Sequence, residues 1–337
     1  MIVIRDYREV DRDNWAQFVA GHPQGNIFHT PEMFDLFSSD KKNDTVFISV
    51  VTPAKMIIGL LIAYIHKEFK GFAGEFTSRA IIWGGPLILE NDPVTAELLI
   101  EELNIICRKK AVYSQFRNLW DIGHYKNNFE KAGYKYEDHL NFLFNLNIGE
   151  ELLWKNIHPT RRKQINRSIK RGVNSRISDE LMQDELEGCY FILKQVYDSA
   201  KLPYPDFEYF QRVFQILGKL GYLKTILATL DEKIIGFRFF LAYKGLLYDW
   251  YAGSLPEHHD KYPNDLLPWE LMKWGSNNGY HIFDFGGAGK PGVPYGVRDY
   301  KMKFGGQLVN YGRYEKVHKP IIMMLARIGF KIWRLFK

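Results

Sequence analysis

The sequence has few cysteines: two among 337 residues, Cys107 and Cys189. They lie far apart in the chain and in no spacing typical of metal ligands, so neither a disulfide framework nor a zinc site is indicated. His258, His259 and Asp260 follow Pro256 in a turn-like run, which favours a surface loop over a metal site. We expect no metal and a reducing compartment.

Long apolar runs are also missing. The N-terminal segment MIVIRDYREVDRDN acquires acidic residues at once and has no apolar stretch of the kind that a secretory signal needs. The other apolar stretches are much shorter than the roughly 20 residues that span a bilayer. We therefore expect a cytoplasmic protein, with at most a peripheral contact at the inner face of the membrane.

Acidic residues are absent from 152–178, although this segment carries eight cations. Helical spacing would place Lys163, Arg167 and Lys170 on one stripe with Arg162 beside it, a layout that suits contact with phosphates. The alternative is a solvated helix face whose cations pair with acids from elsewhere.

What the sequence does contain is typical of a packed globular protein, with 46% hydrophobic and 25% charged residues. The length favours two domains, which we place at 1–150 and 151–316, followed by a C-terminal helix at 317–337. In that helix Arg327, Lys331 and Arg334 recur at helical spacing among apolar residues. Such a basic amphipathic helix docks on the protein itself or lies at a membrane surface.

Periodicity predicts a mixture of strands and helices in both halves. In the first we expect a strand at 2–4, a helix at 12–20, a hairpin at 45–51 and 56–65, a strand at 80–83 and a helix at 94–110. In the second we expect helices at 179–199 and 205–220, strands at 222–230, 233–243 and 246–251, a helix at 264–278 and a strand at 281–285. This order predicts an α+β fold of two sheets layered with helices.

The run YHIFDFGGAGKPGVPYGVRDYKMKFGG, residues 280–306, is the most informative for chemistry. Gly286 and Gly287 follow a predicted strand, where a backbone can turn or approach a ligand closely. Lys301 could stabilise negative charge on a reacting acyl oxygen; the alternative is a strand whose lysines face solvent. Asp284 alternates with phenylalanines, so it is either a proton acceptor or a structural partner of loop amides. Tyr251, at the end of another strand, is a candidate for a ligand hydrogen bond.

Longer motifs carry a family resemblance. YPNDLLPWELMKWGSNNGYHIFDFGG followed by YKMKFGG is similar to the C-terminal signature of the FemABX family, the peptidoglycan interpeptide-bridge aminoacyltransferases. IFHTPEMFDLF, the WGGP turn and ELLWKNIHPTRRKQINRSIKRGV resemble further motifs of the family in the same order. The resemblance implies two lobes with the GNAT acyltransferase fold. It also implies transfer of an aminoacyl group from aminoacyl-tRNA to an amine of a nucleotide- or lipid-linked peptidoglycan precursor, without a cofactor.

The resemblance also assigns residues. The family's motif lysine falls on Lys301, with Tyr300 before it and Arg298 in the same run. Substrate contacts are implied for Tyr251 and Lys201. We also expect Tyr300, Arg298 and the backbone of Gly286 and Gly287 to bind the substrate. Contacts with tRNA phosphates fit Arg162, Lys163, Arg167 and Lys170.

This sequence departs from the family at two points. No segment is long enough for the coiled-coil arm that some members carry, and HTPEMFDLFSSD lacks the lysine of the first lobe's substrate groove. The acceptor amine could therefore differ. Two alternatives remain open: a GNAT-type N-acyltransferase that uses acyl-CoA, although its pyrophosphate-binding turn is not found, and a non-catalytic binding protein on the same fold.

Overall fold

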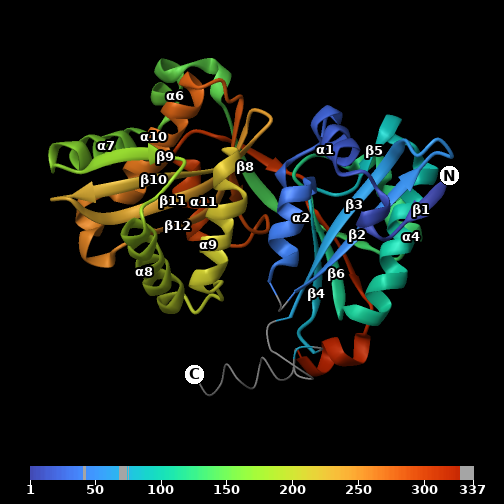
Figure 1. Cartoon of the computed structure of the whole chain (residues 1–337). Coiled ribbons are helices and arrows are strands. Elements are labelled where there is room, and N and C mark those ends of the chain that lie inside the picture. Colours follow the sequence, from blue (N-terminus) through green and yellow to red (C-terminus); the bar gives the residue numbers. More distant parts are fainter. Residues whose placement is uncertain (41–42, 68–73, 75, 327–337) are drawn as a thin grey trace. The chain divides into compact units, whose positions relative to one another are not determined.

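The computed structural model describes residues 1–40, 43–67, 74 and 76–326, and its contacts divide the chain into two units (Figure 1). Unit 1 comprises Met1–Asp138 and Tyr311–Lys337, and unit 2 comprises His139–Asn310. The sequence analysis placed the division at 150 and 316 instead. The difference arises because two short strands, at 140–145 and 313–317, pair in sheets that are built mainly from distant parts of the chain.

Unit 1 is a mixed sheet layered with helices. Its strand order is β1-β2-β3-β4-β6-β15-β7, with β5 paired to β3. Its elements are β1 (Ile2–Ile4), α1 (Arg12–Gly21), α2 (Pro31–Ser38), β2 (Asn43–Val51), β3 (Ile57–His66), β4 (Arg79–Trp83), β5 (Leu87–Ile88), α4 (Pro93–Lys110), β6 (Tyr113–Arg117), α5 (Lys126–Lys131), β7 (Lys135–Glu137) and β15 (Arg313–Val317). Residues 320–326 form a further helix.

Unit 2 repeats this arrangement with the strand order β14-β8-β13-β12-β11-β10-β9. Its elements are β8 (Leu140–Asn145), α6 (Glu150–Asn156), α7 (Pro159–Lys170), β9 (Asn174–Ser178), α8 (Gln183–Ser199), α9 (Phe207–Ile216), β10 (Leu223–Leu230), β11 (Lys233–Tyr243), β12 (Leu246–Ser254), α10 (Pro263–Asn277), β13 (Ile282–Gly287), α11 (Gly296–Met302) and β14 (Gln307–Asn310). The predicted α+β class is confirmed.

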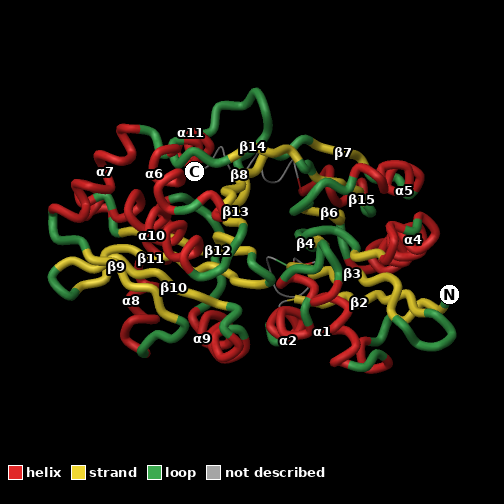
Figure 2. The backbone as a smooth tube through the Cα atoms, turned by 90° about the horizontal axis from the view of Figure 1, so that it is seen from above, coloured by secondary structure: helices red, strands yellow, loops and turns green. Residues whose placement is uncertain are grey.

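Helices cover both faces of the unit 2 sheet because alternate side chains of its strands are apolar on either face. Phe240 and Phe283 point into the cluster that holds Leu267 of α10, whereas Phe239 packs on Phe210 of α9 with ring centroids 5.7 Å apart. Both views place α8 and α9 on one side of the sheet and α7 and α10 on the other (Figures 1 and 2).

In the described part of each sheet, one pair of neighbouring strands is parallel and joined by a helical crossover. The two pairs differ in how far their pairing extends. In unit 1, β4 and β6 pair at five positions, from Arg79↔Tyr113 to Trp83↔Arg117. In unit 2, β12 and β13 pair only from Leu246↔Ile282 to Tyr248↔Asp284. Both strands continue beyond that point, so the backbone of β13 after Asp284 is not bonded to β12.

Candidate active site

Lys301 lies where β12 and β13 separate. Its side chain comes from α11, and the residue is only 8% exposed. The ammonium Nζ donates hydrogen bonds to the backbone oxygens of Phe285 and Gly287, the latter at 3.0 Å, and lies 5.1 Å from the centre of the Phe285 ring. The lysine therefore satisfies β13 carbonyls in the stretch that β12 does not reach. The alternative of a strand with solvent-facing lysines is wrong for this residue, because the segment is helical and Lys301 is buried.

The surroundings of Lys301 favour the neutral form of its amine. The pKa of Lys301 is lowered to about 8, chiefly by burial; Asp249 and Asp284 act to raise this pKa, and the Arg238 guanidinium acts to lower it. An ammonium with three N–H groups and two carbonyl partners has one donor left for a substrate oxygen.

Gly286 and Gly287 shape the backbone beside this ammonium. Gly286 has φ +77°, and a Cβ atom there would lie 3.6 Å from the Lys301 Nζ. A Cβ atom on Gly287 would lie 3.0 Å from His139 Nε2, which is closer than ordinary van der Waals contact. Gly286 therefore permits the left-handed backbone at this point, and Gly287 permits the close approach of His139.

Asp284 is buried on β13, directly before this turn. One carboxylate oxygen, Oδ1, accepts hydrogen bonds from the Gly286 backbone N–H and from Asn141 Nδ2 of β8, both at 2.8 Å. Burial raises the pKa of Asp284 to about 6, although these hydrogen bonds and Lys301 act in the opposite direction. The contacts match the structural role that the sequence analysis left open, and a role as proton acceptor stays a prediction.

A second buried cation, which the sequence analysis missed, lies near Lys301. Arg238 of β11 is 5% exposed, and its Nη1 contacts both carboxylate oxygens of Asp249 on β12, at 2.6 and 2.7 Å. Its guanidinium carbon lies 5.1 Å from the centre of the Phe285 ring, the ring that Lys301 also contacts. A signal existed: Arg238 and Asp249 each interrupt an apolar strand, and the two strands form one hairpin.

Tyr300 joins this network to the helices. Its hydroxyl donates to the backbone oxygen of Asn264, at the start of α10, and lies 3.5 Å from Arg238 Nη2. Arg161, the first arginine of α7, stacks 4.6 Å from the Tyr300 ring centre and forms a buried ion pair with Asp265 of α10. Tyr300 and Arg161 thus lock α7, α10 and α11 together beside Lys301.

Arg298 holds the glycine-rich loop. Its guanidinium donates to the backbone oxygens of Lys290, at 2.7 Å, and Val293. These contacts are with the protein itself, so they fit a residue that fixes the loop; the predicted substrate contact of Arg298 stays a prediction.

Tyr251 and Lys201 lie on the other side of the sheet from α10. The Tyr251 ring packs on Phe210 of α9 and Tyr197 of α8, with centroids 5.1 and 6.3 Å apart. Lys201 is exposed just after the end of α8 and has φ +52°. The structure thus brings Lys301, Asp284, Tyr300 and the glycines together, with Tyr251 and Lys201 at the α8 side of the same sheet.

The predicted basic stripe lies on the exposed side of α7. Lys163, Arg167 and Lys170 are exposed, Arg162 is half-buried, and in the part of the chain that the structure describes none of the four pairs with an acidic side chain. The face is solvated, as the alternative expected, but the expected pairing with acids is not seen for these four residues, and their contact with phosphates stays a prediction.

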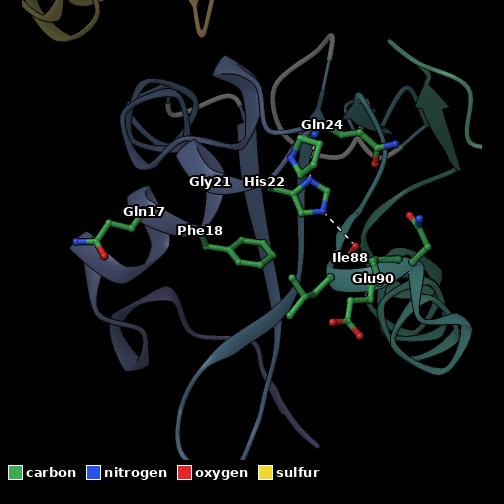
Figure 3. A pocket seen from close by; sticks show the side chains of 10 residues that line it. Gln17, Phe18, Gly21, His22, Gln24, Ile88 and Glu90 are labelled. Atoms are coloured by element: carbon green, nitrogen blue, oxygen red, sulfur yellow. Dashed lines mark hydrogen bonds between the residues drawn. The ribbon is translucent and has the colours of Figure 1, made fainter.

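Unit 1 has a pocket of its own, of about 440 Å³, between the end of α1 and residues 88–91 (Figure 3). His22 joins the two walls: Gln24 N–H donates to its Nδ1, so its Nε2 carries the proton that is donated to the Ile88 oxygen at 3.1 Å. The pocket contains none of the predicted site residues.

Two general features concern the whole described chain. Among residues 1–40, 43–67, 74 and 76–326, no group of three or more His, Cys, Asp or Glu side chains could hold a metal ion. No helix in that same part is long and apolar enough to cross a membrane. The predicted cationic positions Arg327, Lys331 and Arg334 lie outside the described residues.

Comparisons with known proteins identify the fold. Residues 159–302 match the model of the acetyltransferase (GNAT) domain. No curated protein sequence matches the chain. The crystal structure of FemX superposes with a TM-score of 0.74 at 14% identity, covering 97% of this chain and 100% of FemX.

Two further solved structures agree. L-PGS from Bacillus licheniformis gives a TM-score of 0.60 at 15% identity, with 94% of this chain and 96% of that chain covered. A tandem GNAT protein from the clavulanic acid biosynthesis pathway gives 0.60 at 8% identity, with 94% and 98% covered. The chain therefore has the tandem GNAT fold, as its FemABX-like motifs imply, and its second unit carries the match to the GNAT acetyltransferase domain.

Proposed function

We propose that this protein is an acyltransferase that moves an aminoacyl group from aminoacyl-tRNA to an amine of a peptidoglycan precursor. The observation that carries the proposal is the buried Lys301 ammonium at the point where β12 and β13 separate. The FemABX-like motifs and the shared fold with FemX and L-PGS support it.

The reaction requires the protein mainly to position the reactants and to stabilise the negative charge that develops on the carbonyl oxygen. The acceptor amine attacks the ester carbonyl carbon, a C–N bond forms, the C–O bond to the ribose breaks, and the amine's proton ends on the leaving hydroxyl. Negative charge develops on the carbonyl oxygen in the tetrahedral intermediate, and the remaining N–H of Lys301 would donate to it. No cofactor enters this scheme.

The start of α10 argues against acyl-CoA as the donor. In an acyl-CoA-dependent GNAT enzyme, a glycine-rich turn before the corresponding helix offers backbone N–H groups to the pyrophosphate. Here Pro263, which has no N–H, opens α10, and the carboxylate of Asp265 is already buried in the first turn with Arg161. A pyrophosphate at that position would therefore find no backbone N–H at Pro263 and would lie close to the Asp265 carboxylate.

The stripe on α7 supports an RNA-borne donor instead. α7 packs against α10, and its first arginine, Arg161, contacts Tyr300, the residue before Lys301. Phosphates bound along Arg162, Lys163, Arg167 and Lys170 would therefore lie on the helical layer that contains the Lys301 segment.

The test compares donors and variants in one assay. Purified protein is incubated with a pool of radiolabelled aminoacyl-tRNAs or with acyl-CoA thioesters, and transfer to nucleotide- or lipid-linked muropeptides is scored. Lys301→Ala should lower kcat/KM by about 10²–10³, the usual effect of removing one oxyanion donor. The exposed neighbour Lys303 supplies the control, and Lys303→Ala should retain most activity.

The pH profile distinguishes the role of Lys301. An ammonium that stabilises the oxyanion must be charged, so the rate should fall as the pH rises above about 8, the lowered pKa of Lys301. A rate that instead rises through this range would assign Lys301 as a base. Transfer from acyl-CoA alone would favour the N-acyltransferase, and full activity of Lys301→Ala would remove Lys301 from the mechanism.

A further inference from the structure

Unit 1 exposes an apolar ridge on the helix at residues 320–326. Ile321, Met324 and Leu325 are 72%, 56% and 50% exposed. Their spacing of three and four residues places them on one face of the helix. The opposite residues Ile322 and Met323 are half-buried, so the helix leaves one apolar face in solvent.

This helix starts beside the C-terminal turn of α4. The backbone N–H groups of His318 and Lys319 donate to the Val112 oxygen at 2.8 and 3.1 Å, and Lys319 Nζ donates to the Lys109 oxygen at 3.1 Å. Figure 1 shows the red helix next to that end of α4. The ridge is therefore held at a defined place on unit 1.

Cations surround the place where the helix starts. Arg108, Lys109 and Lys110 are exposed in the last turn of α4. Asp44 lies 3.7 Å from Lys110, whereas neither Arg108 nor Lys109 pairs with an acid in the described part of the chain. Burial, with Lys316, Arg108 and Lys319 adding to it, lowers the pKa of His318 to about 4, which is consistent with a positive local field.

The sequence that follows is also rich in cations and large apolar residues. No acidic residue occurs after Glu315, and residues 327–337, which lie outside the described residues, add four cations and six large apolar residues. Charge and hydropathy at this end of the chain therefore both point to an anionic, partly apolar partner.

We propose that the surface formed by Ile321, Met324 and Leu325 with Arg108, Lys109 and Lys319 binds the headgroup region of an anionic lipid bilayer. The cations would contact acidic headgroups while the apolar ridge enters the interface. A purely polyanionic partner such as RNA would leave the ridge in water, and a purely apolar partner would leave the cations unpaired. The inference does not depend on the proposed transfer reaction.

The test is flotation of the full chain with vesicles of phosphatidylcholine and phosphatidylglycerol, and with vesicles of phosphatidylcholine alone. Wild type should float with the anionic vesicles, and less so as salt is added. Arg108→Gln with Lys109→Gln should lower partitioning about fivefold for each cation removed. Met324→Glu with Leu325→Glu should lower it at least about tenfold.

Matched changes elsewhere on unit 1 serve as controls. Met56 is as exposed as Met324, at 56%, so Met56→Glu should leave flotation unchanged. Lys126→Gln with Lys131→Gln should do the same for charge. The proposal is overturned if wild type stays with the soluble fraction or binds both vesicle types equally. It is also overturned if Met324→Glu with Leu325→Glu lowers the melting temperature without changing flotation, since the ridge would then pack on the protein.

Discussion

Two oppositely charged side chains are buried within a few residues of one strand end, and both are shifted toward their neutral forms. Asp284 holds the end of β13 through the Gly286 N–H, while Lys301 of α11 donates to the backbone carbonyls of the same strand end. Asp284 and Lys301 do not form a direct ion pair with each other. Each therefore carries a desolvation cost that its hydrogen bonds only partly offset. Such costs are typical of positions kept for function.

The free-energy cost of burying the Asp284 carboxylate can be measured as a dependence of protein stability on pH. The folded state has a pKa of about 6 for this carboxyl, against 3.8 for an unperturbed one, so between these values the folded state binds more protons than the unfolded state. The free energy of unfolding should therefore fall as the pH rises from about 4 to 6, by at most about 3 kcal/mol.

Asp284→Asn removes that titration and keeps an oxygen that can accept from the Gly286 N–H. Chemical denaturation across this pH range should give a flatter curve for Asp284→Asn than for wild type. Asp299→Asn, at an exposed position on α11, should parallel wild type. Identical slopes for wild type and Asp284→Asn would show that the carboxylate is not destabilised by burial.

At the scale of elements, apolar periodicity predicted the helices and strands whose own pattern is long and continuous. The hairpin at 43–51 and 57–66, the helix at 93–110 and the strands of 223–254 were predicted nearly to their ends, because their apolar periodicity is continuous. β8, β14 and β15 were missed because they are short, and their partners lie up to 200 residues away, so pairing rather than propensity makes them strands.

The residues of the candidate site also fall into two groups, those within one segment of sequence and those brought together only by folding. Lys301, Asp284 and the glycines belong to one contiguous run and were predicted, whereas Arg238, Asp249, Arg161 and Asp265 come from four different elements. Only the register of the β11–β12 hairpin and the packing of α7 on α10 bring those side chains to Lys301.

The basic face of α7 leads to a prediction about RNA binding. Changing Arg162, Lys163, Arg167 and Lys170 to glutamine should weaken binding of uncharged tRNA at least about tenfold. It should also reduce the slope of log K against log salt by about 3, since each phosphate contact contributes about 0.7–0.9. Filter binding at several salt concentrations measures both. The exposed lysines 126, 131, 219 and 233, changed together, provide a control of equal charge, and an equal loss there would mean that no specific stripe exists.

At the scale of the whole molecule, both ends of the chain belong to unit 1, and unit 2 is one continuous segment between them. β15 lies inside the unit 1 sheet between β6 and β7, although β6 precedes it by about 200 residues. Tyr314 is buried there and stacks on Phe129 with centroids 4.1 Å apart. The sheet of unit 1 is thus completed only when the chain has passed through all of unit 2, a topology of high contact order that should fold slowly.

A pair of truncations tests this dependence. A chain that ends at residue 310 lacks β15, so β6 loses its antiparallel partner, β7 loses its only neighbour in the described sheet, and the Tyr314 side chain leaves a large cavity beside Phe129. Unit 1 should then lose protection from amide hydrogen exchange while the strands of unit 2 keep theirs. A chain that ends at residue 326 retains β15 and serves as the control, so unit 1 should stay protected in it. Protected unit 1 amides in the shorter chain would mean that β15 is an accessory strand rather than a part that the sheet requires.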